Sequence, residues 1–329
     1  MKLAICEYGA KVSTEGNCLQ IKAGEEEHSF CADAVSELIL GSHCSITAAA
    51  VKMCMEHDIE LYLPDRFGEP CAIFMPFHHG SAPIVRRKQL YLQDSPFGVA
   101  LAKEFLQIKL ENRVNHLRSL AQNRRDERRQ KINESIEKIR EYITMMEVLS
   151  GNNMEEVRGT LQAYEGNAGR VYFSTISDLL IPEYQFHGRS GNPSYNGYNA
   201  MLNYGYGILY NKTNRYCNTA RMDPYIGIMH VDSYNKPTFC FDLTEMFRIH
   251  AERTVFRLFS RKCVKQLHFD IDEEQGIYYL NKEGKALLVP EFYKEMEKLG
   301  YYKGKRISAE RQMQQKILEI SQRIEAMPF

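Results

Sequence analysis

The sequence predicts an α+β protein: a small, β-rich, sandwich-like N-terminal domain (residues 1–76), a linker (77–85) and a larger all-α C-terminal domain (86–329). Two observations carry this prediction. Short apolar runs separated by turn residues fill the first 76 positions, as is typical of β-strands. After the linker, apolar residues recur at the spacing of amphipathic helices. With 329 residues, 44% of them apolar, the chain is long enough for two domains and a sizeable core.

Strands and one helix are predicted in the N-terminal domain. The helix begins with Ser45 as its N-cap and continues through Met55, because a hydroxyl residue precedes a run of Ala, Val and Met residues. Pro and Gly residues mark turns between the strands and also occur in the linker. Strands are expected at 3–6, 18–21, 59–63 and 71–75.

The C-terminal domain is predicted to consist of long helices. The first opens at Val99 and continues past Leu117, and the second follows a polar break at 122–130. The segment 182–195 contains two prolines and two glycines, so it is predicted to be an irregular loop. Further helices are expected at 154–178, 196–220, 241–263, 283–298 and 306–325.

Composition excludes several classes of protein. No apolar run approaches the roughly 18 residues that a membrane span needs, so no membrane association is expected. A carboxylate at Glu7 comes too early for a secretory signal. The nine cysteines are an odd number without a Cys-x-x-Cys pair, which argues against a disulfide framework and a zinc ribbon. We therefore expect free thiols and a cytoplasmic protein.

The charge is zero in total but is segregated along the chain. Residues 1–80 carry five basic and twelve acidic side chains, whereas residues 86–140 carry fourteen basic and seven acidic ones. Because attraction to phosphate is local and is screened within about 10 Å, a neutral protein with one basic segment can bind a polyanion. A solvated helical face whose charges pair with nearby carboxylates remains the alternative.

Three short stretches carry candidate chemistry. Glu165 lies inside a predicted helix beside small residues, and His230 ends an apolar run. Asp242 and Glu245 are three residues apart, so on a helix both carboxylates point from one face, among apolar neighbours. Buried carboxylates need a cation, a proton or a metal. Spacing alone leaves two interpretations open: a salt-bridged structural set, or a metal site whose oxygen ligands and single imidazole suit Mg²⁺ or Mn²⁺ rather than zinc.

The order of these motifs resembles the CRISPR-associated protein 1 family. Residues 165–173 read Glu-Gly-x-Ala-x-Arg-x-Tyr-Phe, 227–230 read Gly-x-x-His, and 242–248 read Asp-Leu-x-Glu-x-Phe-Arg. Residues 198–206 resemble the family's Asn-Ala-x-Leu-x-Tyr-Gly-Tyr helix. The resemblance spans nearly the whole chain. The chain departs from the family pattern at Gly169, Met246 and His250, none of which is a ligand.

The resemblance implies a CRISPR adaptation integrase, a metal-dependent DNA endonuclease that inserts short fragments into a repeat array by attack of a 3′-hydroxyl. The family's metal ligands fall on Glu165, His230 and Glu245, with Asp242 as an acidic partner and Mg²⁺ or Mn²⁺ as cofactor. Two other functions remain open: a catalytically silent DNA-binding scaffold, and a nonspecific metal-dependent nuclease. The reaction product distinguishes them, because joined DNA indicates an integrase and fragments alone indicate a nuclease.

The resemblance also implies partners in the prokaryotic cytoplasm. They are double-stranded DNA, as the incoming fragment and the repeat, and CRISPR-associated protein 2. The N-terminal domain, being acidic, is expected to form a homodimer rather than to bind DNA. The side chains expected to contact DNA are Arg86, Arg87, Arg124, Arg125, Arg128, Arg129, Arg170, Arg189 and Arg248.

Overall fold

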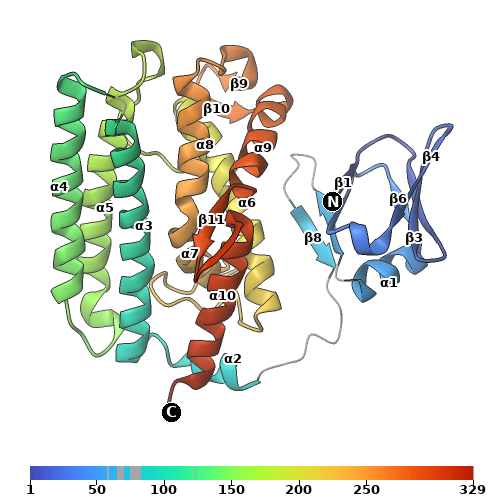
Figure 1. The fold of residues 1–329 in the computed structure, drawn as a ribbon, viewed down its shortest axis with the longest axis horizontal. Coiled ribbons are helices and arrows are strands. Elements are labelled where there is room, and N and C mark those ends of the chain that lie inside the picture. The colour runs from blue at the N-terminus through green and yellow to red at the C-terminus, as the bar shows by residue number, and fades with distance from the viewer. Residues whose placement is uncertain (58, 65–69, 75–82, 123, 329) are drawn as a thin grey trace. The chain divides into compact units, whose positions relative to one another are not determined.

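The computed structural model describes residues 1–57, 59–64, 70–74, 83–122 and 124–328. The chain divides into two compact units, Met1–Ser81 and Ala82–Phe329 (Figure 1). The first is rich in strands and the second is mostly helical, which confirms the predicted class of fold. Most of the predicted linker lies outside the described residues. Its last three residues, from Pro83 to Val85, belong to helix α2.

The N-terminal unit contains two four-stranded sheets. In one, with strand order β1-β5-β7-β8, the first three strands are parallel and the last is antiparallel to its neighbour. In the other, β4-β3-β2-β6, two antiparallel pairs are followed by one parallel pair. The strands are β1 Lys2–Ile5, β2 Lys11–Glu15, β3 Cys18–Ala23, β4 Glu26–Cys31, β5 Glu37–Leu40, β6 Ser45–Ile46, β7 Glu60–Pro64 and β8 Pro70–Phe74.

One hydrophobic core joins the two sheets and helix α1 (Ala48–Glu56). Val12 and Leu19 from one sheet, and Leu38 and Leu61 from the other, are fully buried in it. The short 3-10 helix η1 (Ala32–Ala34) connects β4 to β5. The burial of apolar side chains from both sheets is what holds the sandwich together.

Helix α1 begins two residues later than predicted. Thr47, not Ser45, is its N-cap, and the Thr47 side chain accepts a hydrogen bond from the Ala50 N–H. Ser45 instead lies in strand β6, where it pairs with Lys11 of β2. The Ser45 N–H donates a hydrogen bond to the Ala10 carbonyl. A hydroxyl residue before an apolar run therefore indicated the right region but the wrong cap.

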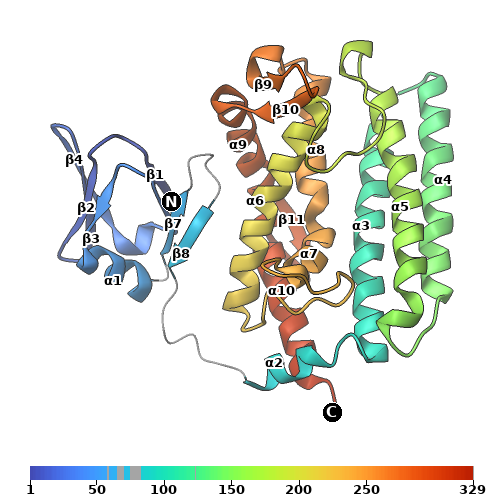
Figure 2. The same ribbon diagram turned by 180° about the vertical axis from the view of Figure 1, so that it is seen from behind.

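The C-terminal unit is a helical bundle (Figure 1, Figure 2). Helices α3, α4 and α5 stand side by side, and α6, α8, α9 and α10 form the rest of the bundle. A continuous hydrophobic core runs through them. The helices are α2 Pro83–Leu90, α3 Pro96–Gln122, α4 Glu127–Val148, α5 Met154–Asp178, α6 Gly197–Thr219, α7 Thr238–Thr244, α8 Arg248–Ser260, α9 Lys282–Met296 and α10 Ala309–Ala326, with the 3-10 helices η2 Pro182–Tyr184, η3 Glu245–Phe247 and η4 Gln266–His268.

Two antiparallel hairpins interrupt the predicted all-α domain. Strands β9 (Phe269–Asp272) and β10 (Ile277–Leu280) form one, and β11 (Leu299–Tyr302) and β12 (Lys305–Ser308) form the other. The last helix, predicted to begin at residue 306, therefore begins at Ala309 as α10, and Ser308 is its N-cap. Both hairpins turn through residues with positive φ, a local geometry that helical periodicity does not reveal.

The helix predicted over 241–263 is broken at the candidate site. It becomes α7, the tight turn η3 and α8. At the break, the Asn112 side chain on α3 donates a hydrogen bond of 3.0 Å to the Met246 carbonyl, an acceptor that the break leaves free. The break presents Glu245 toward α3.

None of the helices in the described ranges has the length and apolar character needed to cross a membrane.

Candidate active site

The structure brings Glu165 of α5 and Glu245 of η3 together. Lys109 on α3 donates to both: its Nζ lies 2.5 Å from Glu165 Oε1 and 2.5 Å from Glu245 Oε2. Two contacts of 2.5 Å place these carboxylate oxygens within about 5 Å of each other. Residues 80 positions apart in sequence thus meet around one ammonium group.

His230 is held by Asp242 of α7. The Asp242 side chain is buried and accepts hydrogen bonds from the backbone N–H groups of Ile228, Met229 and His230. Its Oδ1 also lies 2.6 Å from His230 Nδ1. Because a carboxylate can only accept, Nδ1 carries the proton, and in the neutral ring Nε2 keeps its lone pair.

The electrostatics keep the two glutamates ionised. Burial acts to raise the pKa of Glu245, but the charges of Arg248 and Lys109 outweigh it and lower that pKa to about 2. Burial likewise opposes ionisation of Glu165, whose pKa the charge of Lys109 holds below its usual value. For His230 burial lowers the pKa, yet the hydrogen bond and charge of Asp242 prevail and raise it.

Two arginines complete the cluster. Arg248 Nη2 lies 2.8 Å from Glu245 Oε1, and its guanidinium lies 4.4 Å from the centre of the Tyr206 ring. Arg113, one helical turn after Lys109, pairs with buried Glu252 at 2.6 Å and approaches Glu165 Oε1 at 3.8 Å. The site is therefore a buried network of alternating charges.

The donor set fits a divalent cation. Two ionised, convergent carboxylates and one imidazole with a free Nε2 match the preferences of Mn²⁺ and Mg²⁺. As they stand, however, no three His, Cys, Asp or Glu side chains in the described part of the chain converge closely enough to hold an ion. Glu165 and Glu245 do converge, but the cation that they share is the Lys109 ammonium.

The predicted DNA-contacting arginines fall into two groups. Six of them are exposed: Arg86 and Arg87 on α2, Arg125 just before α4, Arg128 and Arg129 in the first turn of α4, and Arg170 on α5. Arg128 and Arg170 line one groove of about 520 Å³ between α4 and α5. Lys131 and Lys138 also line it, with two carboxylates from Glu134 and Asp178. This groove is therefore a basic surface that contains two of the arginines predicted to contact DNA.

The other three arginines point inward or are partly buried. Arg248 binds Glu245 and the Tyr210 hydroxyl, and Arg189 donates to the side-chain oxygens of Asn199 and Asn203. Arg124 is half-buried and donates to the Leu120 carbonyl. Arg189 and Arg248 thus have partners within the protein, and their contact with phosphate stays a prediction.

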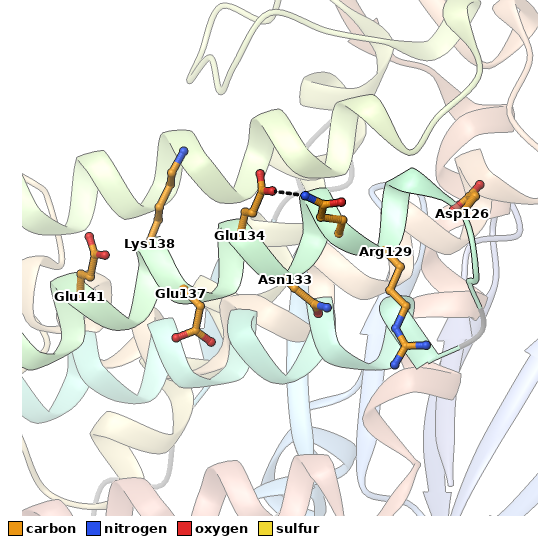
Figure 3. Close-up of a pocket in the computed structure, with 8 residues that line it drawn as sticks. Asp126, Arg129, Asn133, Glu134, Glu137, Lys138 and Glu141 are labelled. Atoms are coloured by element: carbon orange, nitrogen blue, oxygen red, sulfur yellow. Dashed lines mark hydrogen bonds between the residues drawn. The ribbon is translucent and has the colours of Figure 1, made fainter.

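Several cations of the basic segment 86–140 are bound within the protein, so fewer of them can contact DNA than its charge suggests. Lys88 is buried and donates to the Glu325 and Met327 carbonyls, while Lys109 and Arg113 belong to the charge cluster described above. Along the outer face of α4, carboxylates outnumber cations, as Figure 3 shows. That face carries Asp126, Arg129, Gln130, Asn133, Glu134, Glu137, Lys138 and Glu141. The excess positive charge is thus concentrated near the start of α4.

Residues 3–294 match the model of the family described as CRISPR associated protein Cas1. The chain belongs to this family. A curated relative, the CRISPR-associated endonuclease Cas1 1 of Archaeoglobus fulgidus, is 27% identical over 319 residues, which cover 94% of this chain and 92% of the relative.

Solved structures share the Cas1 fold with this chain. A casposase bound to its integration product aligns with a TM-score of 0.78 and 20% identity, covering 99% of this chain and 90% of that one. A chain of a Cas6-RT-Cas1–Cas2 complex aligns with a TM-score of 0.73 and 20% identity, covering 99% of this chain and 35% of that one. At these identities the likeness establishes the fold.

The main residue that the sequence analysis missed in this Cas1 chain is Lys109. A detectable signal existed, because Lys109 and Arg113 directly precede Leu110 and Val114 and share the buried stripe of α3 with them. A cation at a core position requires a buried carboxylate as its partner. At Gly169, one of the departures from the Cas1 pattern, an alanine would also fit, because an added Cβ would lie 3.5 Å from Arg113 Nη1, an ordinary contact.

Proposed function

We propose that this protein is a CRISPR adaptation integrase that joins short DNA fragments to a repeat array by metal-dependent phosphodiester transfer. The observation that carries the proposal is the meeting of ionised Glu165 and Glu245, with His230 held by Asp242 in the same helical unit. The A. fulgidus relative is named an endonuclease, and one structural neighbour holds an integration product.

Glu165, Glu245 and the Nε2 of His230 would hold Mg²⁺ or Mn²⁺. When bound, such an ion activates an attacking hydroxyl and neutralises charge on the phosphate. Asp242 orients the imidazole and fixes its tautomer, as carboxylate partners of ligating histidines do. Arg248 keeps Glu245 ionised from the opposite side.

The substrates would be two pieces of double-stranded DNA, the incoming fragment and the repeat. Arg125, Arg128 and Arg129 at the start of α4 and Arg170 in the adjacent groove would contact phosphates. One phosphodiester replaces another in such a transfer, so no ATP is consumed. A 3′-hydroxyl of the fragment attacks a repeat phosphodiester, and the repeat's own 3′-hydroxyl leaves.

The assembly would use both units. We assign residues 1–76 to a homodimer contact, because this region is acidic and poor in cations, and residues 86–329 to catalysis and DNA binding. CRISPR-associated protein 2 is the expected partner, since a structural neighbour is a Cas1–Cas2 complex. Eight of the nine cysteines have described side chains and are free thiols, which fits action in the reducing prokaryotic cytoplasm.

The test is a joining assay. A labelled duplex with a 3′-hydroxyl, a repeat-bearing plasmid, CRISPR-associated protein 2 and Mn²⁺ are incubated with the wild type, Glu165→Ala, His230→Ala or the matched control Glu141→Ala on the outer face of α4. The wild type and Glu141→Ala should join the label to the plasmid, and the two site variants should not. Fragments without joined product would indicate a nuclease, and binding without any reaction would indicate a scaffold.

A further inference from the structure

The ammonium group of Lys109 occupies the position between Glu165 and Glu245 that a metal ion bound by both carboxylates would occupy. Its side chain is 6% exposed, and its ammonium donates to both carboxylates at 2.5 Å. A buried ammonium with two charged acceptors is strongly held, because each hydrogen bond between charged groups is about twice as strong as a neutral one.

A divalent ion and this ammonium cannot share the position between the two carboxylates. Placed side by side, the two cations would repel each other in a poorly screened interior, where the interaction of charges is strongest. We infer that Lys109 is a displaceable counter-ion: it neutralises Glu165 and Glu245 in the metal-free protein, leaves when the metal binds, and then pairs with a DNA phosphate. This inference rests on the proposed function.

Lys109 is not the sole positive charge beside the two carboxylates. Glu245 keeps Arg248 at 2.8 Å, and Glu165 keeps Arg113 at 3.8 Å. The Arg113 Nη1 atom is buried and makes no hydrogen bond within the described residues, so it has donor capacity left for Glu165. Departure of the ammonium therefore leaves both carboxylates beside an arginine, ready for a metal.

The ammonium has a route to the substrate. The Glu165 side chain is 27% exposed, whereas those of Lys109 and Glu245 are almost fully buried, so the cluster opens on the Glu165 side. The four-carbon stem of lysine lets its charge move while its Cα stays in α3.

This exchange couples metal binding to DNA binding. Without DNA, the displaced ammonium loses two charged acceptors in a buried site, and this cost weakens metal binding. With DNA, a phosphate replaces those acceptors and removes the cost. By linkage, metal and DNA must then strengthen each other's binding, and Lys109 is the positioning residue through which they do so.

The experiment measures Mn²⁺ binding from the spin-resonance signal of free Mn²⁺, with and without a duplex whose 3′ ends are dideoxy and cannot react. The proteins are the wild type, Lys109→Met, Lys109→Gln, and Lys103→Met as the matched control. Lys103 is also on α3 but donates to the Glu147 and Leu149 carbonyls, away from the cluster. Binding of Mn²⁺ to the duplex alone is subtracted.

In the wild type and in Lys103→Met, the duplex should strengthen Mn²⁺ binding. In Lys109→Met and Lys109→Gln, Mn²⁺ without DNA should bind at least about tenfold tighter than in the wild type, and the duplex should add little. If a Lys109 variant unfolds in EDTA, Mn²⁺ should restore its folded state, because the ion replaces the missing counter-ion.

Several results would overturn the inference. Equal Mn²⁺ affinity in the wild type and the Lys109 variants, persistent coupling in those variants, or no rescue of an unfolded variant by Mn²⁺ would each contradict it while leaving metal-dependent joining intact. Absence of Mn²⁺ binding in every protein, with and without DNA, would instead remove the metal from the proposed function.

Discussion

Asp242 holds His230 at two atoms at once. Asp242 Oδ1 accepts a hydrogen bond from the His230 backbone N–H at 3.1 Å and another from the ring Nδ1 at 2.6 Å. Asp242 Oδ2 accepts from the backbone N–H groups of Ile228 and Met229. One buried carboxylate therefore fixes both the loop and the imidazole that the loop carries, and this makes Asp242 a positioning residue.

Replacing Asp242 with asparagine tests this relationship. The asparagine side chain has one oxygen that accepts hydrogen bonds and one NH2 group that donates them. The NH2 group would therefore lie against backbone N–H groups, and these buried donors would lose their acceptor. The free energy of unfolding, measured with urea, should fall by about 1–3 kcal/mol. Joining activity should fall as well, because the imidazole loses its orienting carboxylate. The matched control is Asp94→Asn, at an exposed position between α2 and α3. Equal stability of Asp242→Asn and the wild type would contradict the positioning role.

Buried histidines predict how stability depends on pH. Burial lowers the pKa of His116 to about 3, and its Nδ1 lies 2.8 Å from the Tyr172 hydroxyl. A folded pKa below the ordinary 6.5 means that unfolding takes up a proton as the pH falls below 6.5. His116 therefore contributes stability that is present above about pH 6.5 and is lost toward acid, by up to about 1.4 kcal/mol per pH unit.

The measurement is urea unfolding between pH 7 and pH 5 of the wild type, His116→Gln and the exposed control His28→Gln. The curve for His116→Gln should be shallower than the wild-type curve, and the curve for His28→Gln should follow the wild type. A His116→Gln curve parallel to the wild type would show that His116 titrates normally in the folded protein.

The sequence singled out Glu165, His230 and Glu245 through the order of their motifs, which resembles the Cas1 family, and their role as ligands stays a prediction. Spacing alone left a salt-bridged structural set open, because buried carboxylates need only a partner of some kind. The partner itself, Lys109, lies 56 residues before Glu165, and only the packing of α3 against α5 and η3 brings the two together. Long-range pairing of this kind leaves no local pattern.

Elements with exposed or tightly turned backbones were also missed. Strand β4 carries mostly exposed polar side chains, so it shows no apolar alternation, and the β11–β12 hairpin depends on positive φ at Lys303 and Gly304. Long helices with buried stripes, such as α5, were predicted with the bounds that the structure shows. Periodicity therefore served best for long helices with one face against the core, whereas the short strands β2 and β5 were missed although they carry buried side chains.

Removal of cations at the start of α4 should weaken DNA binding. Arg125, Arg128 and Arg129 are exposed, whereas neighbouring Arg124 is held by the Leu120 carbonyl and is best left intact. Changing the three exposed arginines to alanine should make the slope of log affinity against log salt shallower by about 0.9 for each phosphate that the variant no longer neutralises. The control is Arg140→Ala, farther along α4. An unchanged slope in the triple variant would make this a solvated surface.

Removal of the N-terminal unit should abolish the homodimer. A chain starting at Ala82 keeps the whole hydrophobic core of the second unit and should remain folded. Light scattering should give a monomer for this chain and a dimer for the full chain, with circular dichroism as the check on folding. A dimer of the shortened chain would place the contact in the helical unit instead.

Replacing Arg248 tests whether this arginine serves an internal ion pair or contacts a DNA phosphate. It is 17% exposed, pairs with Glu245 at 2.8 Å, donates to the Tyr210 hydroxyl and stacks on Tyr206. Arg248→Met removes one partner of a buried ion pair, so the free energy of unfolding without metal should fall by about 3 kcal/mol. The salt dependence of DNA binding should stay at the wild-type slope, because an arginine bound internally neutralises no phosphate. Arg170→Met, on an exposed position of α5, should do the reverse: it should leave stability unchanged and lower the slope. A shallower slope for a folded Arg248→Met protein would return this arginine to the DNA-binding surface.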